Sequence, residues 1–293
     1  MVKILLAACN AKYIHSNLAV HSLRAYLARH RPELSASVLV REYTINQQKD
    51  GILKEIYRIA PDVVCFSCYI WNSSYTADLI RDLSRILPHT RIWAGGPEAG
   101  YRAEQFLTEN PALTGVMIGE GEQTFLRLAE TYARSEGEHR MPTAEDWREI
   151  PGIAYREQGE ILLTAPAAAL DLDSVPFPYE DLEPFRNRIL YYESSRGCPF
   201  SCSYCLSSIE KQLRFRSISL VERELQFFLD RRVPQVKFVD RTFNCRHSHS
   251  LAIWKYLRDH DNGVTNFHFE IAADLLTEEE LECISGMRPG LIQ

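Results

Sequence analysis

The chain lacks any apolar run that approaches the about 20 residues of a membrane-spanning helix. It also lacks a recognisable secretory signal pattern at its start. Basic charge is not in excess, because 33 Lys and Arg residues face 39 Asp and Glu residues, for a net charge of −6. This balance provides no electrostatic footprint for nucleic acid. These absences predict a cytoplasmic protein that has no membrane partner, and they give no evidence for nucleic acid, although a local basic patch would be compatible with the net charge.

The composition is that of an ordinary globular protein, with 45% hydrophobic and 25% charged residues in a chain of 293, long enough for two domains. Its eight cysteines are not expected to form disulfides in a cytoplasmic chain. Cys9, Cys65, Cys68 and Cys283 lie in or beside apolar runs, which predicts buried free thiols. Cys245 has polar neighbours, and the sequence assigns it no role.

The remaining three cysteines, Cys198, Cys202 and Cys205, follow the apolar run 189–192 closely. Three thiolates on one loop can hold three corners of a cubane iron–sulfur cluster and leave the fourth iron open. A closed ferredoxin cluster or a structural zinc site takes four ligands instead. An open iron allows another molecule to complete the coordination, which is typical of a catalytic site. The alternatives are a zinc loop with a distant fourth ligand, or three unrelated buried thiols.

The spacing Cys-x3-Cys-x2-Cys, with Tyr204 before its last cysteine and an Arg-Gly-Cys-Pro opening at 196–199, resembles the radical S-adenosylmethionine superfamily. The resemblance implies a 4Fe-4S cluster whose open iron binds S-adenosylmethionine. It also implies an external electron donor and cleavage of the cofactor to a 5′-deoxyadenosyl radical. Tyr204 is an implied contact of S-adenosylmethionine.

Two carboxylates downstream of the cysteines are further implied contacts of S-adenosylmethionine. Asp240 follows the second expected strand of this domain, where the family places groups that bind the amino end of the cofactor. Glu270 lies on the third expected strand, where the family often contacts the ribose or the carboxylate. Helix capping or turn formation is the alternative role for Asp240. Glu270 is expected within an apolar strand, where a buried carboxylate needs a partner.

The region before the cysteines alternates between apolar runs of strand length and segments with helical periodicity. Strands are predicted at 2–8, 36–40, 63–67, 91–94 and 115–118, and helices at 18–28, 52–59, 75–87, 103–108 and 123–133. Near-continuous apolar strands are typical of a parallel sheet covered on both faces. The pattern therefore predicts an α/β, flavodoxin-like, doubly wound domain, which binds ligands beyond the carboxyl ends of its strands.

The loops expected at that edge carry unusual residues, namely Asn10, Tyr13, His15, Ser67, Gly95, Gly96, Gly119, Glu120 and Gly121. Gly95 and Gly96 have no Cβ and allow backbone to approach a ligand closely, whereas Gly121 and Glu122 have helix capping as an alternative role. Together with the cysteine motif downstream, the set resembles the cobalamin-binding domain of cobalamin-type radical S-adenosylmethionine enzymes. The resemblance implies that these loops contact cobalamin.

One feature of the cobalamin fold is missing from the first loop. The Asp-x-His-x-x-Gly motif, whose histidine is the lower ligand of cobalt, does not occur there, and His15 has a different context, Tyr-Ile-His-Ser. Many radical members of the family lack this motif, and they are thought to bind cobalamin without a protein histidine. We therefore expect base-off binding, with ligation by His15 as the alternative.

We predict a cobalamin-binding-type domain at 1–136, a hairpin and Pro-rich linker at 137–187, and a radical domain at 188–293. The last is expected to be the N-terminal half of a (β/α)6 partial TIM barrel, because three units and the start of a fourth are recognisable. We expect such a fragment not to turn over by itself, since half a barrel shelters a radical poorly from water.

The function predicted from these resemblances is methyl transfer to an unactivated carbon, or another radical rearrangement, on a substrate that the sequence does not specify. Two alternatives remain open at this stage. One is a radical enzyme whose N-terminal domain no longer binds cobalamin. The other is a non-catalytic iron–sulfur protein that acts in electron transfer or sensing.

Overall fold

The structure, a computed structural model, describes residues 2–209 and 211–293. The chain divides into two compact units, residues 1–170 and 171–293. None of the helices in the described residues is long and apolar enough to cross a membrane.

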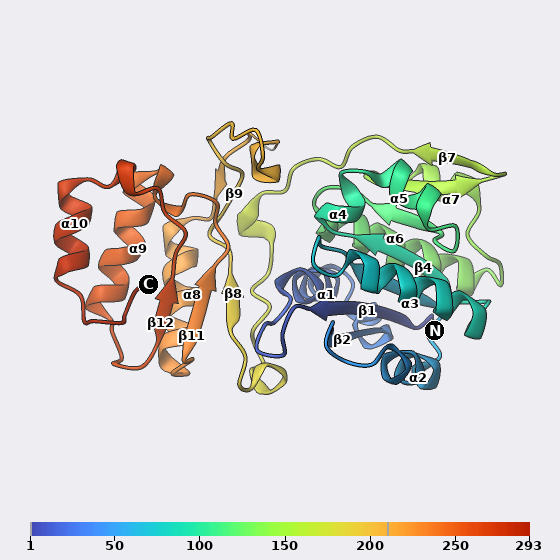
Figure 1. Ribbon diagram of the computed structural model, residues 1–293, viewed down its shortest axis with the longest axis horizontal. Helices are drawn as coiled ribbons and strands as arrows, with labels where there is room; N and C mark the ends of the chain where they lie inside the picture. Colours follow the sequence, from blue (N-terminus) through green and yellow to red (C-terminus); the bar gives the residue numbers. More distant parts are fainter. Residues whose placement is uncertain (1, 210) are drawn as a thin grey trace. The chain divides into compact units, whose positions relative to one another are not determined.

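The first unit is built on a sheet that has seven strands within the described residues (Figure 1). Its strands are β1 (Ile4–Asn10), β2 (Val38–Thr44), β3 (Val63–Ser67), β4 (Arg91–Gly95), β5 (Gly115–Met117), β6 (Ile153–Glu157) and β7 (Glu160–Leu163). The strand order is β2-β1-β3-β4-β5-β6-β7, and β1 to β5 all run parallel. The order of the first five is that of flavodoxin-like folds.

Helices cover both faces of this sheet (Figure 1). They are α1 (Leu18–His30), α2 (Lys49–Ile59), α3 (Ser73–Ile86), α4 (Pro97–Gly100), α5 (Ala103–Glu109), α6 (Gly121–Gly137) and α7 (Ala144–Arg148). Alternate residues of β1 belong to opposite cores: Leu6 packs with residues of α1 and α6, and Leu5 packs with residues of α2, α3 and α5. Burial on both faces explains the continuous apolar runs and confirms the doubly wound prediction.

The hairpin expected in the segment 137–187 is part of this sheet rather than of a linker. Strands β6 and β7 pair antiparallel across a turn in which Gln158 and Gly159 both have positive φ, as a two-residue hairpin turn requires. Strand β6 pairs antiparallel with β5, so the parallel sheet continues into the hairpin. The boundary between the units consequently lies at residues 170–171 and not at residue 136.

The second unit contains three parallel strands in the order β12-β11-β8 within the described residues. Its strands are β8 (Leu190–Tyr192), β9 (Ser195–Arg196), β10 (Arg214–Phe215), β11 (Gln235–Phe238) and β12 (Asn266–His268), and its helices are α8 (Ile218–Asp230), α9 (His247–Asp259) and α10 (Glu278–Ser285). A parallel bridge between Phe267 and Ile292 begins a third pairing, on the outer side of β12. These successive parallel β/α units agree with the barrel-type architecture that the sequence predicts for this region.

The Pro-rich segment before β8 packs onto the second unit. Phe177 makes edge contacts with Tyr179, Phe227 and Phe228, with ring centroids 5.2–5.4 Å apart. The carbonyl oxygen of Val175 accepts a hydrogen bond from Arg216 at 3.1 Å. The segment that was expected to be an extended linker is therefore part of the folded second unit, because it covers some of the aromatic core of that unit.

Replacing Gly115 or Gly51 by alanine should change the stability of the chain in opposite directions. A Cβ at Gly115, where β5 enters the sheet, would collide with the Trp93 ring and lie 2.6 Å from the Ala154 carbonyl oxygen. A Cβ at Gly51, in α2, would meet no atom within 4 Å. We expect Gly115→Ala to lower the free energy of unfolding by about 1–3 kcal/mol and Gly51→Ala to raise it by about 0.5–1 kcal/mol. Urea denaturation measures the free energy of unfolding of both variants. An equal change in the two variants would contradict the close contact of Gly115 with Trp93 and Ala154.

Candidate functional site

The first candidate site is the carboxyl edge of the sheet in the first unit. The strand order changes direction between β1 and β3, because β2 lies on one side of β1 and β3 to β5 lie on the other. Asn10 and Ser67 end these two strands. Doubly wound sheets bind ligands at such a switch point, so two of the predicted cobalamin contacts lie where this fold binds ligands.

A buried carboxylate, Glu42 of β2, organises the loop after β1. Its Oε1 accepts hydrogen bonds from Asn10 Nδ2 at 2.9 Å and from the backbone N–H of Asn17 at 2.5 Å, and its Oε2 lies 3.1 Å from His21 Nε2. Asn10 Nδ2 also donates to the carbonyl oxygen of His15 at 2.9 Å. Our sequence interpretation missed Glu42 because it ended the second strand at residue 40, whereas β2 extends to residue 44.

The loop after β3 is closed by Asn72, which is completely buried. Its Nδ2 donates to the carbonyl oxygens of Cys9 and Ser67 at 2.9 and 3.0 Å, and its Oδ1 accepts from the backbone N–H of Tyr69 at 2.8 Å. These bonds tie the loop to the ends of both β1 and β3. All three bonds are made within the protein, so they hold this loop in one conformation.

Gly96 was expected to let the backbone approach a ligand, but its close neighbour is another loop. With φ of +95°, a Cβ at Gly96 would lie 2.6 Å from the carbonyl oxygen of Cys68. Gly95 is buried, and a Cβ there would make ordinary contact with Met117. Glycine at position 96 therefore serves the packing of the loops after β3 and β4 against each other.

Gly119, Glu120 and Gly121 have three different environments. A Cβ at Gly119 would meet no atom within 4 Å, so this residue borders open space. Glu120 accepts a hydrogen bond from the backbone N–H of Leu170 at 3.0 Å, and a Cβ at Gly121 would press on Leu23 at 3.0 Å. Gly121 is the first residue of α6 and Glu120 is its N-cap, so the capping role considered for Gly121 and Glu122 is wrong.

Large apolar side chains are exposed on the loops after β1 and β3. We call them the apolar rim: Tyr13, Ile14, Ile70 and Trp71. Ile70 is 81% exposed, and the Trp71 ring stacks on Tyr69 with centroids 4.4 Å apart. Transfer of isoleucine and tryptophan side chains out of water is favourable, because it lowers the free energy of the system. The rim is consequently suited to cover an apolar ligand surface.

The second candidate site is the cysteine loop, residues 197–213, which connects β9 and β10. These two strands pair antiparallel, with Arg196 opposite Arg214. Gly197 has φ of +93°, and a Cβ there would lie 2.5 Å from the carbonyl oxygen of Gln212. The two ends of the loop are therefore held close together, and only glycine fits at its start.

The three thiols of this loop differ in their exposure, since Cys198 is buried, Cys202 exposed and Cys205 half-buried. The backbone N–H of Cys205 donates to the carbonyl oxygen of Cys202 at 3.1 Å and forms a tight turn. Across residues 2–209 and 211–293, no group of three or more His, Cys, Asp or Glu side chains is close enough to hold a metal ion. Three thiols are the ligands that an iron–sulfur cluster takes, but the three sulfur atoms do not point to one common position in this structure.

The thiols of the loop and those of the core have opposite electrostatic environments. Hydrogen bonds from Ser207 lower the pKa of the Cys205 thiol, and the Arg241 guanidinium acts in the same direction. Burial raises the pKa of Cys9 to about 12, and it also raises the pKa of the buried Cys68. Cys205 is thus more readily present as a thiolate, the form that binds metal. Arg241 is a site residue that our sequence interpretation missed.

The residues predicted to contact S-adenosylmethionine differ widely in exposure. Tyr204 is 90% exposed. Glu270 lies two residues beyond the end of β12, and its exposed carboxylate pairs with Arg241 at 2.7 Å. The expectation that Glu270 is buried within a strand is wrong, because β12 ends at His268. Asp240 is almost fully buried, with both oxygens bound by Ser194 and Ser195.

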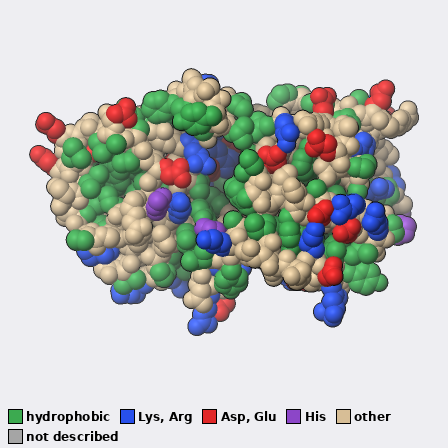
Figure 2. All heavy atoms as spheres, viewed as in Figure 1, with side chains coloured by type: hydrophobic (Ala, Val, Ile, Leu, Met, Phe, Trp, Pro, Cys, Tyr) green, Lys and Arg blue, Asp and Glu red, His purple; other side chains and the backbone are tan. Residues whose placement is uncertain are grey.

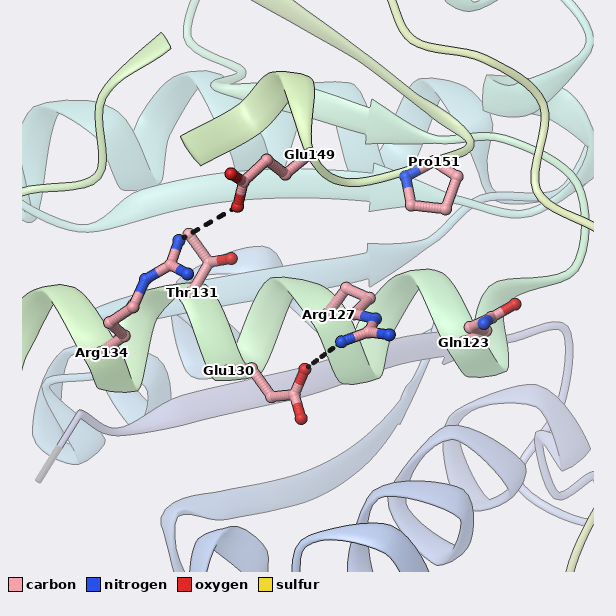
Figure 3. Close-up of a pocket in the computed structure, with 7 residues that line it drawn as sticks. All are labelled: Gln123, Arg127, Glu130, Thr131, Arg134, Glu149 and Pro151. Carbon is pink, nitrogen blue, oxygen red and sulfur yellow. Dashed lines mark hydrogen bonds and ion pairs between the residues drawn. The ribbon is translucent and has the colours of Figure 1, made fainter. Parts of the chain in front are cut away.

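A cavity of about 300 Å³ lies on the outer side of α6 (Figure 3). Its two guanidinium groups are matched by carboxylates: Arg127 lies 3.2 Å from Glu130, and Arg134 lies 3.7 Å from Glu149. None of the predicted site residues lines it. On the visible face of the first unit, acidic and basic side chains are interspersed in the same way (Figure 2). The cavity therefore offers no net charge to a ligand and is not a candidate site.

Comparison with known proteins identifies one matching family and several similar proteins. The B12 binding domain family matches residues 4–129. The chain is 27% identical over 212 residues, 68% of its length, to the cobalamin-dependent radical SAM methyltransferase TokK of Streptomyces tokunonensis. It is 28% identical over 165 residues, 53% of its length, to the anaerobic magnesium-protoporphyrin IX monomethyl ester cyclase of Cereibacter sphaeroides.

Among solved structures, the chain resembles the cobalamin-dependent S-adenosylmethionine radical enzyme OxsB, with aqua-cobalamin and S-adenosylmethionine bound. The TM-score is 0.75 over 97% of this chain, at 20% sequence identity, which supports the fold. The chain spans 29% of TokK, 26% of the cyclase and 42% of OxsB. These relatives are named as enzymes, so the prediction of an enzyme family is confirmed, as is the family resemblance. Residues 4–129 therefore match the B12 binding domain family, and the chain is similar in sequence to cobalamin-dependent radical S-adenosylmethionine enzymes.

Proposed function

We propose that Cys198, Cys202 and Cys205 hold a 4Fe-4S cluster with one open iron, and that this iron binds S-adenosylmethionine. The observation that carries the proposal is the glycine-closed cysteine loop at the carboxyl end of β8, in a chain related to radical S-adenosylmethionine enzymes. When bound and reduced by an external electron donor, the cluster supplies one electron that splits S-adenosylmethionine into methionine and a 5′-deoxyadenosyl radical.

The residues around the loop have roles that follow from their positions. Tyr204 and Glu270 are exposed, so both are accessible to S-adenosylmethionine. Arg241 pairs with Glu270 and influences Cys205, which suits it to orient a carboxylate close to the loop. All of these groups lie on segments that follow the parallel strands of the second unit, at the edge where barrel enzymes bind their substrates.

We propose that the first unit binds cobalamin base-off, over the carboxyl edge of its sheet and against the apolar rim. The match to the B12 binding domain family over residues 4–129 supports this role. The position of Asn10, Ser67 and Gly119 at that edge supports it too. We assign no cobalt ligand to His15, because it does not stand in an Asp-x-His-x-x-Gly motif.

The reaction that we propose is cobalamin-dependent methyl transfer, because TokK is named as a methyltransferase. A different radical outcome is the second candidate, since the cyclase named above covers 53% of the chain. We propose no specific substrate. Chemical analysis of the products, together with the measurements below, separates these two outcomes.

Replacing any one of Cys198, Cys202 and Cys205 by alanine should abolish the cluster. A ligand set of three leaves no spare thiolate, so anaerobic reconstitution should give no iron–sulfur absorption and no paramagnetic resonance signal after reduction. Cys283→Ala is the control, because Cys283 is a free thiol on α10, outside the loop. A full cluster in the triple variant would refute the assignment, and one equivalent of zinc without iron would favour a structural metal site.

Ile70→Asp should weaken cobalamin binding by the chain about tenfold or more, since an apolar side chain that is buried on binding contributes about 1.5–3 kcal/mol. Trp71→Ala should weaken it similarly. Tyr57→Ala is the control, because Tyr57 is 56% exposed on α2, away from the carboxyl edge. Equilibrium titration followed in the visible spectrum measures the affinity.

His15→Ala should leave both the affinity and the cobalt spectrum nearly unchanged. A large loss of affinity with an altered spectrum would instead assign His15 as a cobalt ligand. Complete absence of cobalamin binding by the unmodified chain would favour an N-terminal domain that has lost this cofactor.

A further inference from the structure

A buried hydrogen-bond network lies behind the cysteine loop. Asp240, two residues beyond the end of β11, is 1% exposed. Its Oδ1 accepts from the hydroxyls of Ser194 and Ser195, both at 2.6 Å, and its Oδ2 accepts from the backbone N–H of Ser194 at 3.0 Å. An ionised carboxylate can accept all three bonds. Both of its oxygens therefore face the chain that enters the cysteine loop.

His249 of α9 completes this network from the other side. Its Nε2 lies 3.1 Å from Ser194 Oγ. The single hydroxyl proton of Ser194 is donated to Asp240, so the hydrogen-bond pattern assigns the donating proton of this contact to His249 Nε2. The histidine ring packs at 4.9 Å against Phe215 of β10, the residue paired with Ser195. The network therefore contacts both β9 and β10, the two strands that the loop connects.

A second contact joins the same two segments closer to the thiols. Thr242, two residues after Asp240, has φ of +60°, a conformation that is unusual for a β-branched residue. Its Oγ1 lies 3.9 Å from Cys198 Sγ. The surrounding structure must hold Thr242 in this strained conformation. The segment 240–242 therefore contacts the loop at its entrance and again at its first cysteine.

We propose that Asp240 is a positioning residue for the cysteine loop. Through Ser194 and Ser195 it fixes the entrance of the loop, and so keeps Cys198 buried against Thr242, in place to receive a cluster. This role rests on the proposed function of the three thiols. It differs from the contact with S-adenosylmethionine expected for Asp240, because both carboxylate oxygens are already engaged within the protein.

The test compares Asp240→Asn and the double variant S194A/S195A with the unmodified 293-residue chain. The first readout uses the chain without a cluster: mass spectrometry follows the alkylation rate of each thiol. Both variants should accelerate alkylation of Cys198, which is buried, and leave that of Cys202, which is already exposed, unchanged. Glu280→Gln is the matched control, since Glu280 is also a buried carboxylate that accepts hydroxyl bonds but contacts α9 instead of the loop.

The second readout is the loss of iron to a chelator after anaerobic reconstitution. Removal of an outer hydrogen-bond partner of a metal site typically costs about 10–100-fold in affinity, so both variants should lose iron about tenfold faster or more. The triple variant that carries Asp240→Asn, Ser194→Ala and Ser195→Ala should lose iron only slightly faster than Asp240→Asn alone, because each variant removes the same hydrogen-bond network. Circular dichroism checks that the variants fold, and Ser195→Ala alone replaces any variant that does not.

The outcomes separate the two proposals. An unmodified chain that takes up no iron refutes the cluster assignment, while the alkylation rates still decide the role of Asp240. Alkylation of Cys198 and iron loss that stay at the unmodified rates in Asp240→Asn overturn the positioning role. So does an Asp240→Asn chain that retains iron normally but loses the spectral response to S-adenosylmethionine, since that result assigns Asp240 to the cofactor.

Discussion

Parallel strand pairing is the constraint on which both units depend. A parallel pair needs a crossover connection of a dozen or more residues, so helices follow the strands and bury the sheet of the first unit on both faces. The same geometry brings the carboxyl ends of all parallel strands to one edge of each sheet. Asn10 and Ser67 meet at such an edge in the first unit. In the second unit, the cysteine loop, Asp240 and Glu270 follow the ends of parallel strands.

Segments that leave a sheet lose the hydrogen bonds of its ladder, and here single buried side chains replace them. Glu42, Asn72 and Asp240 each make at least three hydrogen bonds to neighbouring segments. Burial of a polar group is costly unless its bonds are made, and a buried network in which every bond is made is rigid. Each of these side chains therefore specifies one conformation of its loop before any ligand binds.

The cysteines of the chain illustrate how environment separates chemistry from packing. Cys9, Cys65 and Cys68 are buried among apolar side chains, where desolvation raises the pKa of the thiol and leaves it inert. Cys205 lies on a polar loop, where hydrogen bonds from Ser207 lower its pKa. Chemically identical side chains are thus core residues in one unit and metal-binding candidates in the other.

The sequence by itself determined the features that depend on local pattern. Continuous apolar runs predicted the parallel strands, because strands buried on both faces have no polar side, and the spacing of Cys198, Cys202 and Cys205 predicted a shared loop. It did not determine that the hairpin 153–163 joins the first sheet or that Glu270 lies beyond the end of β12.

The tertiary structure alone decided which distant residues meet. Asp240 bonds to Ser194 across 46 positions, Asn72 to Cys9 across 63 and Asn10 to Glu42 across 32. These pairs depend on strand order and register. Periodicity encodes which face of a strand is buried, but it does not encode which neighbour the strand takes, because backbone hydrogen bonds are the same for every partner.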